Sequence, residues 1–201
     1  MQRKQRGFTI VELLIVIVVI AILAALAVTA YNGITTQANN SKTAAAVQAY
    51  KKALFLYAQD NGDYPPLSNV TGACFGIGYP SQACSSAHNG LERASFNTAL
   101  LPYLGNTLPE PSLNNFSGTS GGVTGALLYR HSSMTLDGVS NPYMMLYVLQ
   151  GATTKCPVGP IVNAYGIWPN YSSAIPVVGY SAPLGSNGVQ CFIPMPDPTK
   201  L

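Results

Sequence analysis

The sequence predicts an α+β protein in which a long N-terminal hydrophobic α-helix packs against a small antiparallel β-sheet head. Two observations predict this class: every residue from Leu13 to Val28 is apolar, and after about residue 60 the chain is divided by Pro and Gly into short strand-like segments. Only 8% of the 201 residues are charged, against roughly 25% in an average soluble domain. This composition excludes a charge-rich disordered chain and disfavours a strongly basic nucleic-acid binder.

The net charge of +3 comes from three basic residues near the start, Arg3, Lys4 and Arg6. Without them the rest of the chain has 10 − 3 = 7 positive and 7 negative side chains. The segment Phe8–Val28, interrupted only by Thr9 and Glu12, would form a helix of roughly 31 Å, about one bilayer core. Under the positive-inside rule the basic residues stay in the cytoplasm. We therefore expect a single membrane pass, with the chain after about Thr29 outside.

Glu12 is the exception in this apolar segment. A carboxylate in a membrane helix costs roughly 2.5–3.5 kcal/mol, so a positive partner is expected, yet the next positive residue along the chain is Lys42. A cut between Gly7 and Phe8 would supply such a partner, because the new N-terminal amino group would lie about one helical turn before Glu12.

The residues Gly7-Phe8-Thr9-Ile10-Val11-Glu12 follow a short basic leader and precede the apolar run. This arrangement resembles the class III signal of type IV prepilins. The resemblance covers only about the first 30 residues. It implies cleavage after Gly7 by a prepilin peptidase, N-methylation of Phe8, and pairing of Glu12 with the Phe8 amine of a neighbouring subunit. Many members of that family carry Gly or Pro within this helix, whereas residues 13–32 contain neither.

Two other signals fit the same segment less well. An ordinary secretory signal would be cut after Ala25-Leu26-Ala27, and a plain signal anchor would carry Glu12 incidentally. The mature N-terminus separates the three interpretations, because it would be Phe8, Val28 or Met1 respectively.

The helical pattern continues beyond the apolar segment. Val47, Tyr50, Leu54 and Tyr57 are spaced 3, 4 and 3 residues apart, which places them on one helix face. A bend is expected near Gly33, and stop signals follow in Asn61-Gly62 and Pro65-Pro66. The predicted organisation is a leader (1–7), a long helix (8–60, of which 8–28 is the transmembrane segment or filament core) and a β-rich head (61–201).

Within the head, a short helix is predicted in Leu91–Leu104 and a loop in Pro111–Gly125. Four stretches have strand character, and antiparallel pairing is expected because no long helical crossover separates them. These stretches are Ala126–His131, Tyr143–Gln150, Ala174–Tyr180 and Val189–Pro194.

All four cysteines lie in the part expected outside the membrane, and an even count in an exported, loop-rich head predicts two disulfides. Three connectivities are possible, and free buried thiols are the alternative. We favour Cys74–Cys84 and Cys156–Cys191, the second of which the resemblance implies, since many pilins have a C-terminal disulfide loop.

No motif predicts catalysis, a cofactor or a metal site, so a non-enzymatic role is expected. Cys84-x-x-x-His88 lacks further zinc ligands at suitable spacing, and Asp60-Asn61-Gly62-Asp63 reads as a turn rather than a calcium loop. Gly118–Gly122 matches G-x-S-x-G without the strand and helix that motif requires. His88 and His131 have no acid partner placed by the sequence, and Trp168 is at most an exposed contact.

The resemblance implies a structural subunit of a type IV pilus-like surface filament that serves adhesion, twitching motility or DNA uptake. Its partners would be other copies in a helical filament, the prepilin peptidase, the assembly machinery, and the membrane before assembly. The head would bind a surface or DNA, if it has a ligand. The alternatives are a pseudopilin of a type II secretion system and a minor or tip pilin. The precursor would be a single-pass membrane protein, and the mature chain an extracellular pilus component.

Overall fold

A computed structural model divides the chain into two compact units, Met1–Ala38 and Asn39–Leu201, and each is described by itself. It describes residues 8–67, 71–85, 89–113, 124–130, 135–136, 139–140, 143–151, 156, 163–165, 175–176, 182–183 and 188–200.

Helix α1 runs from Ile10 to Asn61 as one element of 52 residues and continues through Gly33. Its first turns carry no Gly or Pro that would break them. It ends where the sequence predicts, because Gly62 takes a left-handed φ of +78° and its N–H bonds the carbonyl of Ala58 at 2.8 Å. In the second unit, three residues of the predicted face, Val47, Tyr50 and Leu54, are buried. The fourth, Tyr57, is half-buried and packs against the same core.

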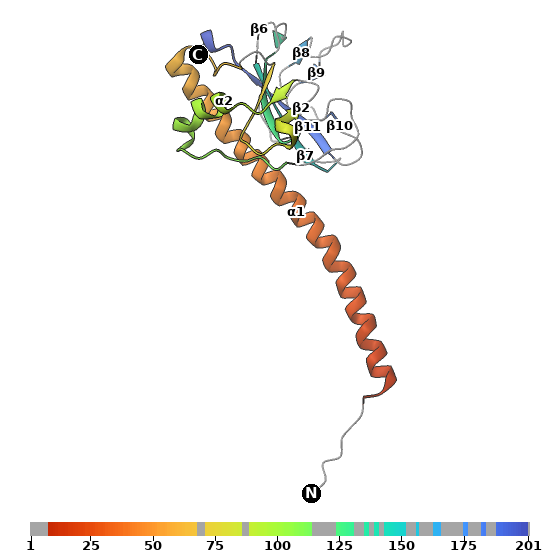
Figure 1. Ribbon diagram of the computed structural model, residues 1–201. Helices are drawn as coiled ribbons and strands as arrows, with labels where there is room; N and C mark the ends of the chain where they lie inside the picture. Colours follow the sequence, from red (N-terminus) through yellow and green to blue (C-terminus); the bar gives the residue numbers. More distant parts are fainter. Residues whose placement is uncertain are drawn as a thin grey trace. The chain divides into compact units, whose positions relative to one another are not determined.

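The head contains a seven-stranded sheet in the order β10-β11-β7-β4-β1-β3-β2. Its strands lie along the C-terminal turns of α1 (Figure 1). A second sheet has the order β6-β5-β8-β9. The strands are β1 (Gly72–Cys74), β2 (Ala83–Ser85), β3 (Gly90–Leu91), β4 (Ala126–Arg130), β5 (Thr135–Leu136), β6 (Val139–Ser140), β7 (Tyr143–Gln150), β8 (Asn163–Tyr165), β9 (Ile175–Pro176), β10 (Ala182–Pro183) and β11 (Gly188–Met195).

The three long strands β4, β7 and β11 match the predicted stretches, and they pair antiparallel as expected. The expectation of a wholly antiparallel head sheet is wrong at one place: β1 pairs with β3 in parallel, with Gly72 opposite Gly90. Segment 75–89 supplies the crossover that a parallel pair needs. Of the predicted strand Ala174–Tyr180, only β9 falls in the described residues, and most of the predicted loop Pro111–Gly125 lies outside them.

Strand β7 is buried on both of its faces. Met145 and Tyr147 join the core that includes Tyr50 and Leu54 of α1. Their neighbours Met144 and Leu146 point to the other face and are also less than 2% exposed. Burial on both faces explains why the sequence of this strand is continuously apolar instead of alternating.

The predicted short helix is present as α2 (Ala94–Leu100), followed by the 3-10 turn η2 (Leu101–Leu104). Two further 3-10 turns are η1 (Pro80–Gln82) and η4 (Pro198–Lys200). Phe96 and Leu100 are the side chains through which α2 enters the core.

Polar side chains on α1 fix two loops of the head to the helix. The amide of Asn40 donates to the carbonyl of Gln150 at 2.9 Å and accepts from the Gln150 N–H at 2.7 Å. Thr43 accepts from the N–H of Ser112 at 3.0 Å, and Asn39 accepts from the Ser112 hydroxyl at 3.2 Å. These bonds tie the end of β7 and the segment at Ser112 to α1, so they mark where the head begins on the helix.

Candidate functional site

The start of α1 is closed by a reciprocal capping box formed by Thr9 and Glu12. The Glu12 Oε2 atom accepts from the Thr9 N–H at 2.8 Å and from the Thr9 hydroxyl at 2.7 Å. The Glu12 N–H donates back to the Thr9 Oγ1 atom at 3.2 Å. Sequence reasoning identified Glu12 but missed Thr9, although the T-x-x-E pattern before an apolar run is the signal for this cap.

Replacing Thr9 by valine is expected to loosen the first turn of α1, because valine keeps the shape but loses the hydroxyl. An N-cap is worth typically about 1 kcal/mol, so the Glu12 amide should exchange its hydrogen about fivefold faster. Hydrogen exchange on the detergent-solubilised chain measures this rate. Thr9→Ser keeps the hydroxyl and is the matched control, and equal exchange in the valine and serine variants would contradict the cap.

The first turns of α1 present an apolar surface that nothing in the first unit covers. Between Phe8 and Val28 the large apolar side chains are 47% to 84% exposed. The most apolar window has a mean hydropathy of 3.2, and the helix is long and apolar enough to cross a membrane. A continuous exposed surface of this kind requires lipid or other protein around it.

The predicted processing and assembly residues lie at the beginning of this surface. Gly7 is outside the described residues, Phe8 is 80% exposed, and Glu12 lies one turn further along. Within the described part of the chain, no Lys or Arg lies within ion-pair distance of Glu12. The Thr9 cap therefore satisfies hydrogen bonds of the carboxylate, while its charge meets no counterion among the described residues.

Both favoured disulfides are present, Cys74–Cys84 with a Cα–Cα distance of 5.8 Å and Cys156–Cys191 with 5.7 Å. All four cysteines are buried. The alternative of free thiols is therefore wrong, and Cys84 offers no thiolate to a zinc ion in this oxidised state.

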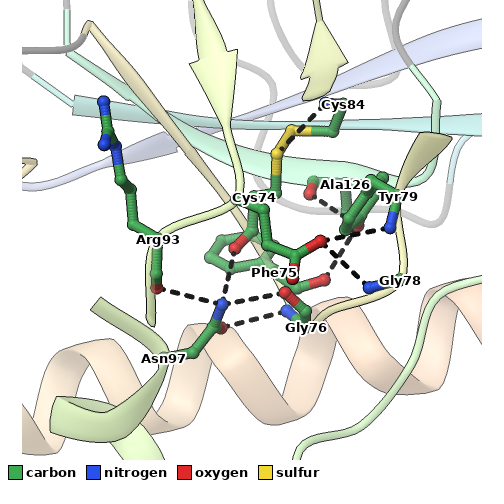
Figure 2. Close-up of a disulfide and its surroundings, with 10 residues drawn as sticks. Cys74, Phe75, Gly76, Gly78, Tyr79, Cys84, Arg93, Asn97 and Ala126 are labelled. Atoms are coloured by element: carbon green, nitrogen blue, oxygen red, sulfur yellow. Dashed lines mark hydrogen bonds between the residues drawn. A yellow bond between two sulfur atoms is a disulfide. The ribbon is translucent and has the colours of Figure 1, made fainter. Parts of the chain in front are cut away.

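The first disulfide closes a loop that buried polar groups hold rigidly (Figure 2). Asn97 is 2% exposed and makes four hydrogen bonds. Its Oδ1 atom accepts from the Gly76 N–H at 3.0 Å, and its Nδ2 atom donates to the carbonyl oxygens of Gly76, Cys74 and Arg93 at 2.8, 3.3 and 3.3 Å. Asn97 thus pairs with the loop backbone much as a neighbouring strand would.

Two further side chains hold the far end of this loop. A carboxylate oxygen of Glu92 accepts from the N–H groups of Gly78 and Tyr79 at 3.0 and 3.2 Å. The Tyr79 hydroxyl reaches the carbonyl oxygens of Phe75 and Ala126 at 2.8 and 3.2 Å. Burial raises the pKa of Tyr79, so its hydroxyl stays protonated as a donor at neutral pH.

Asn97→Ala is expected to destabilise the head by about 3 kcal/mol, because the Gly76 N–H and the Gly76 and Cys74 carbonyl groups lose a hydrogen bond in a buried site. Urea denaturation of the full chain in detergent, followed by tyrosine fluorescence, measures the loss. Ser95→Ala on the exposed side of α2 is the control. An unchanged midpoint for Asn97→Ala would contradict the role given to this amide.

The sequence Asp60-Asn61-Gly62-Asp63 ends helix α1 at Asn61, and the chain bends at Gly62 and Asp63, where a turn was predicted. The Asp60 carboxylate accepts from the Tyr103 hydroxyl at 2.8 Å, and Asp63 accepts from the Tyr64 N–H at 2.7 Å. Among the described residues no three His, Cys, Asp or Glu side chains gather as a metal site would require. Gly118–Gly122, His88, His131 and Trp168 lie outside the described residues.

Comparison with known proteins agrees with the resemblance seen in residues 7–12. The family model for the prokaryotic N-terminal methylation motif matches residues 2–28. The type II secretion system core protein G of Dickeya chrysanthemi is 37% identical over 73 residues, which is 36% of this chain and 48% of that protein. The matched region thus spans about half the length of this relative. No solved structure matches.

Proposed function

We propose that this chain is cut by a prepilin peptidase after Gly7 and assembles through α1 into a helical filament of copies. The observation that carries the proposal is the methylation motif at residues 2–28, placed at the start of a helix whose first turns are apolar and exposed. Before assembly the membrane would cover that helix, and in the filament the helices of neighbouring copies would cover it.

Glu12 supports assembly by giving the apolar helices a register. Its charge has no counterion among the described residues. Moving it from the membrane edge into a bundle of helices is favourable only when it meets a positive group. Cleavage after Gly7 creates such a group, the Phe8 amine, and methylation leaves its positive charge in place. The Phe8 amine of each subunit would then neutralise the Glu12 carboxylate of its neighbour. This pairing is possible at one relative position of the two helices only.

The two disulfides support an exported position of the head, because such bonds persist in oxidising compartments. The mature chain would carry 7 positive and 7 negative side chains. This balance disfavours DNA binding along the whole filament, since phosphate attraction needs clustered positive charge. Adhesion and twitching motility are thus better candidates than DNA uptake for a surface pilus, and we assign the chain no catalytic step.

A second candidate is a pseudopilin, and the relative supports it, since that protein is named a core protein of a type II secretion system. The two disulfides of the head favour a surface pilin over a pseudopilin. In the pilus case, deleting the gene removes surface filaments and leaves enzyme export unchanged. In the pseudopilin case, exported enzymes accumulate inside the cell envelope. A minor or tip pilin would be present in purified filaments in far fewer copies than the main subunit.

Sequencing the N-terminus of the chain in purified filaments tests the shared proposal. The expected result is N-methylated Phe8 as first residue. A chain starting at Val28 or Met1, or a chain never found in filaments, would contradict it.

A further inference from the structure

The described residues of the second unit expose only three large apolar side chains. These are Leu56 (38% exposed), Ile77 (52%) and Leu113 (41%). Two of them, Leu56 and Ile77, lie beside side chains of opposite charge, lysines near Leu56 and Glu92 near Ile77.

Ile77 is displayed at the tip of the loop that Cys74–Cys84 closes. Its neighbours Gly76 and Gly78 have φ values of +86° and +88°, so both positions favour glycine. Asn97 holds the backbone on one side of Ile77, and Glu92 holds it on the other. The side chain is therefore presented on a rigid support, and little conformational entropy would be lost when it is buried by a partner.

The same loop carries a negative charge close to Ile77. The Glu92 carboxylate lies within hydrogen-bond distance of the Gly78 and Tyr79 amides. In Figure 2 the Arg93 side chain extends away from the Gly78 end of the loop, so it does not cancel this charge there.

Leu56 lies on one exposed face of α1, over a shallow and largely open depression of about 420 Å³ that is called the groove below. Phe55 and Leu56 supply its apolar part, while Lys51 and Lys52 make it positive. Neither lysine forms an ion pair with a described residue. The full lining is Gln48, Lys51, Lys52, Phe55, Leu56 and Gln59.

The loop and the groove lie on opposite flanks of α1. The ring of Tyr50 stacks on Phe75 at 4.5 Å, and a Cβ on Gly76 would lie 3.7 Å from the Tyr50 hydroxyl. At about 100° per residue, Lys52 and Gln59 lie about 160° and 180° around the helix from Tyr50. The loop of one copy can therefore bind a second copy while its own groove stays open to a third. This is the geometry of a head-to-tail interface, which extends into a filament.

We propose that the groove is occupied by a second copy of this chain. Ile77 of one subunit packs on Phe55 and Leu56 of a neighbour, and Glu92 faces the neighbour's lysine pair. This contact rests on the proposed filament, and it adds a specific contact between heads to the association of the apolar helices. Because a filament repeats the contact at every subunit, a weak single interaction has a large combined effect.

Photo-crosslinking in assembled filaments tests the contact directly. Ile77 is replaced by p-benzoylphenylalanine, purified filaments are illuminated, and cross-linked peptides are identified by mass spectrometry. The expected product is a covalent dimer joined between position 77 and residues 48–59. The same probe at Leu113 is the control and should not label residues 48–59. Filaments that give no dimer from position 77, or a dimer joined elsewhere, would overturn the contact while leaving the filament itself established.

Two substitutions give an independent measurement in the full chain. Ile77→Ser and Lys52→Glu should each lower the amount of filament that survives shearing by about threefold or more, because the loss at one contact is repeated at every subunit. Leu113→Ser is the matched control for Ile77→Ser. Lys42→Glu is the matched control for Lys52→Glu, because Lys42 lies outside the groove. Equal yields from test and control variants would count against the contact. Absence of filaments from the unaltered chain would instead refute the proposed function, and the contact with it.

Discussion

Glu12→Ala is expected to abolish filaments while leaving cleavage after Gly7 largely intact. The variant removes the only carboxylate in the apolar part of α1. The Phe8 ammonium of each neighbour would then have to be buried without a counterion. Removing one partner of a buried ion pair costs about 3–5 kcal/mol, so filament yield should fall by at least about 100-fold.

Quantifying sheared filaments by immunoblot, together with the mass of the membrane-bound chain, checks both halves of this expectation. Glu110→Ala is the control, because Glu110 is a carboxylate on the head whose 4.0 Å pair with Lys42 is largely exposed. Its loss should change filament yield little. Normal filaments from Glu12→Ala would refute the pairing with Phe8, and an uncleaved Glu12→Ala chain would show that Glu12 serves the peptidase instead.

Gly7→Val is expected to stop processing almost completely. The resemblance to prepilins implies that the peptidase cuts directly after Gly7, where a β-branched side chain would crowd the peptide bond to be cut. The uncut chain would keep Arg3, Lys4 and Arg6 and would never form the Phe8 amine. It should therefore accumulate in the membrane with its leader and form no filaments.

The intact mass of the membrane-bound chain measures this directly. Gly33→Val is the matched control, because a Cβ at Gly33 meets nothing within 4 Å, so this variant should be cut normally. A Gly7→Val chain that begins at Phe8 would contradict the assignment of the cleavage site. Failure of both variants to be cut would point to a general defect in membrane insertion.

The long elements of the fold were predictable because their signals are local. The apolar run and the 3-4-3 spacing of Val47, Tyr50, Leu54 and Tyr57 specify α1 within a few turns. Strands β4, β7 and β11 are long and apolar enough to stand out from their surroundings. The T-x-x-E cap at Thr9 is an equally local signal.

The short strands of the head carried no such signal. Strands β1, β2 and β3 have two or three residues each, which is too few for an alternating pattern to be recognised. Their pairing, including the parallel contact between Gly72 and Gly90, depends on neighbours that are distant in sequence. The same holds for Asn40, whose partner Gln150 is 110 residues away.

Residue types alone are enough to identify the leader motif, the apolar helix with its single carboxylate, and the even cysteine count. Each of these depends on residue types within one short window or on composition. The folded chain was needed to establish which cysteines pair, which polar side chains hold the Ile77 loop, and that loop and groove lie on opposite flanks of α1. These features depend on contacts between segments far apart in the chain, and such contacts exist only once the core has brought the segments together.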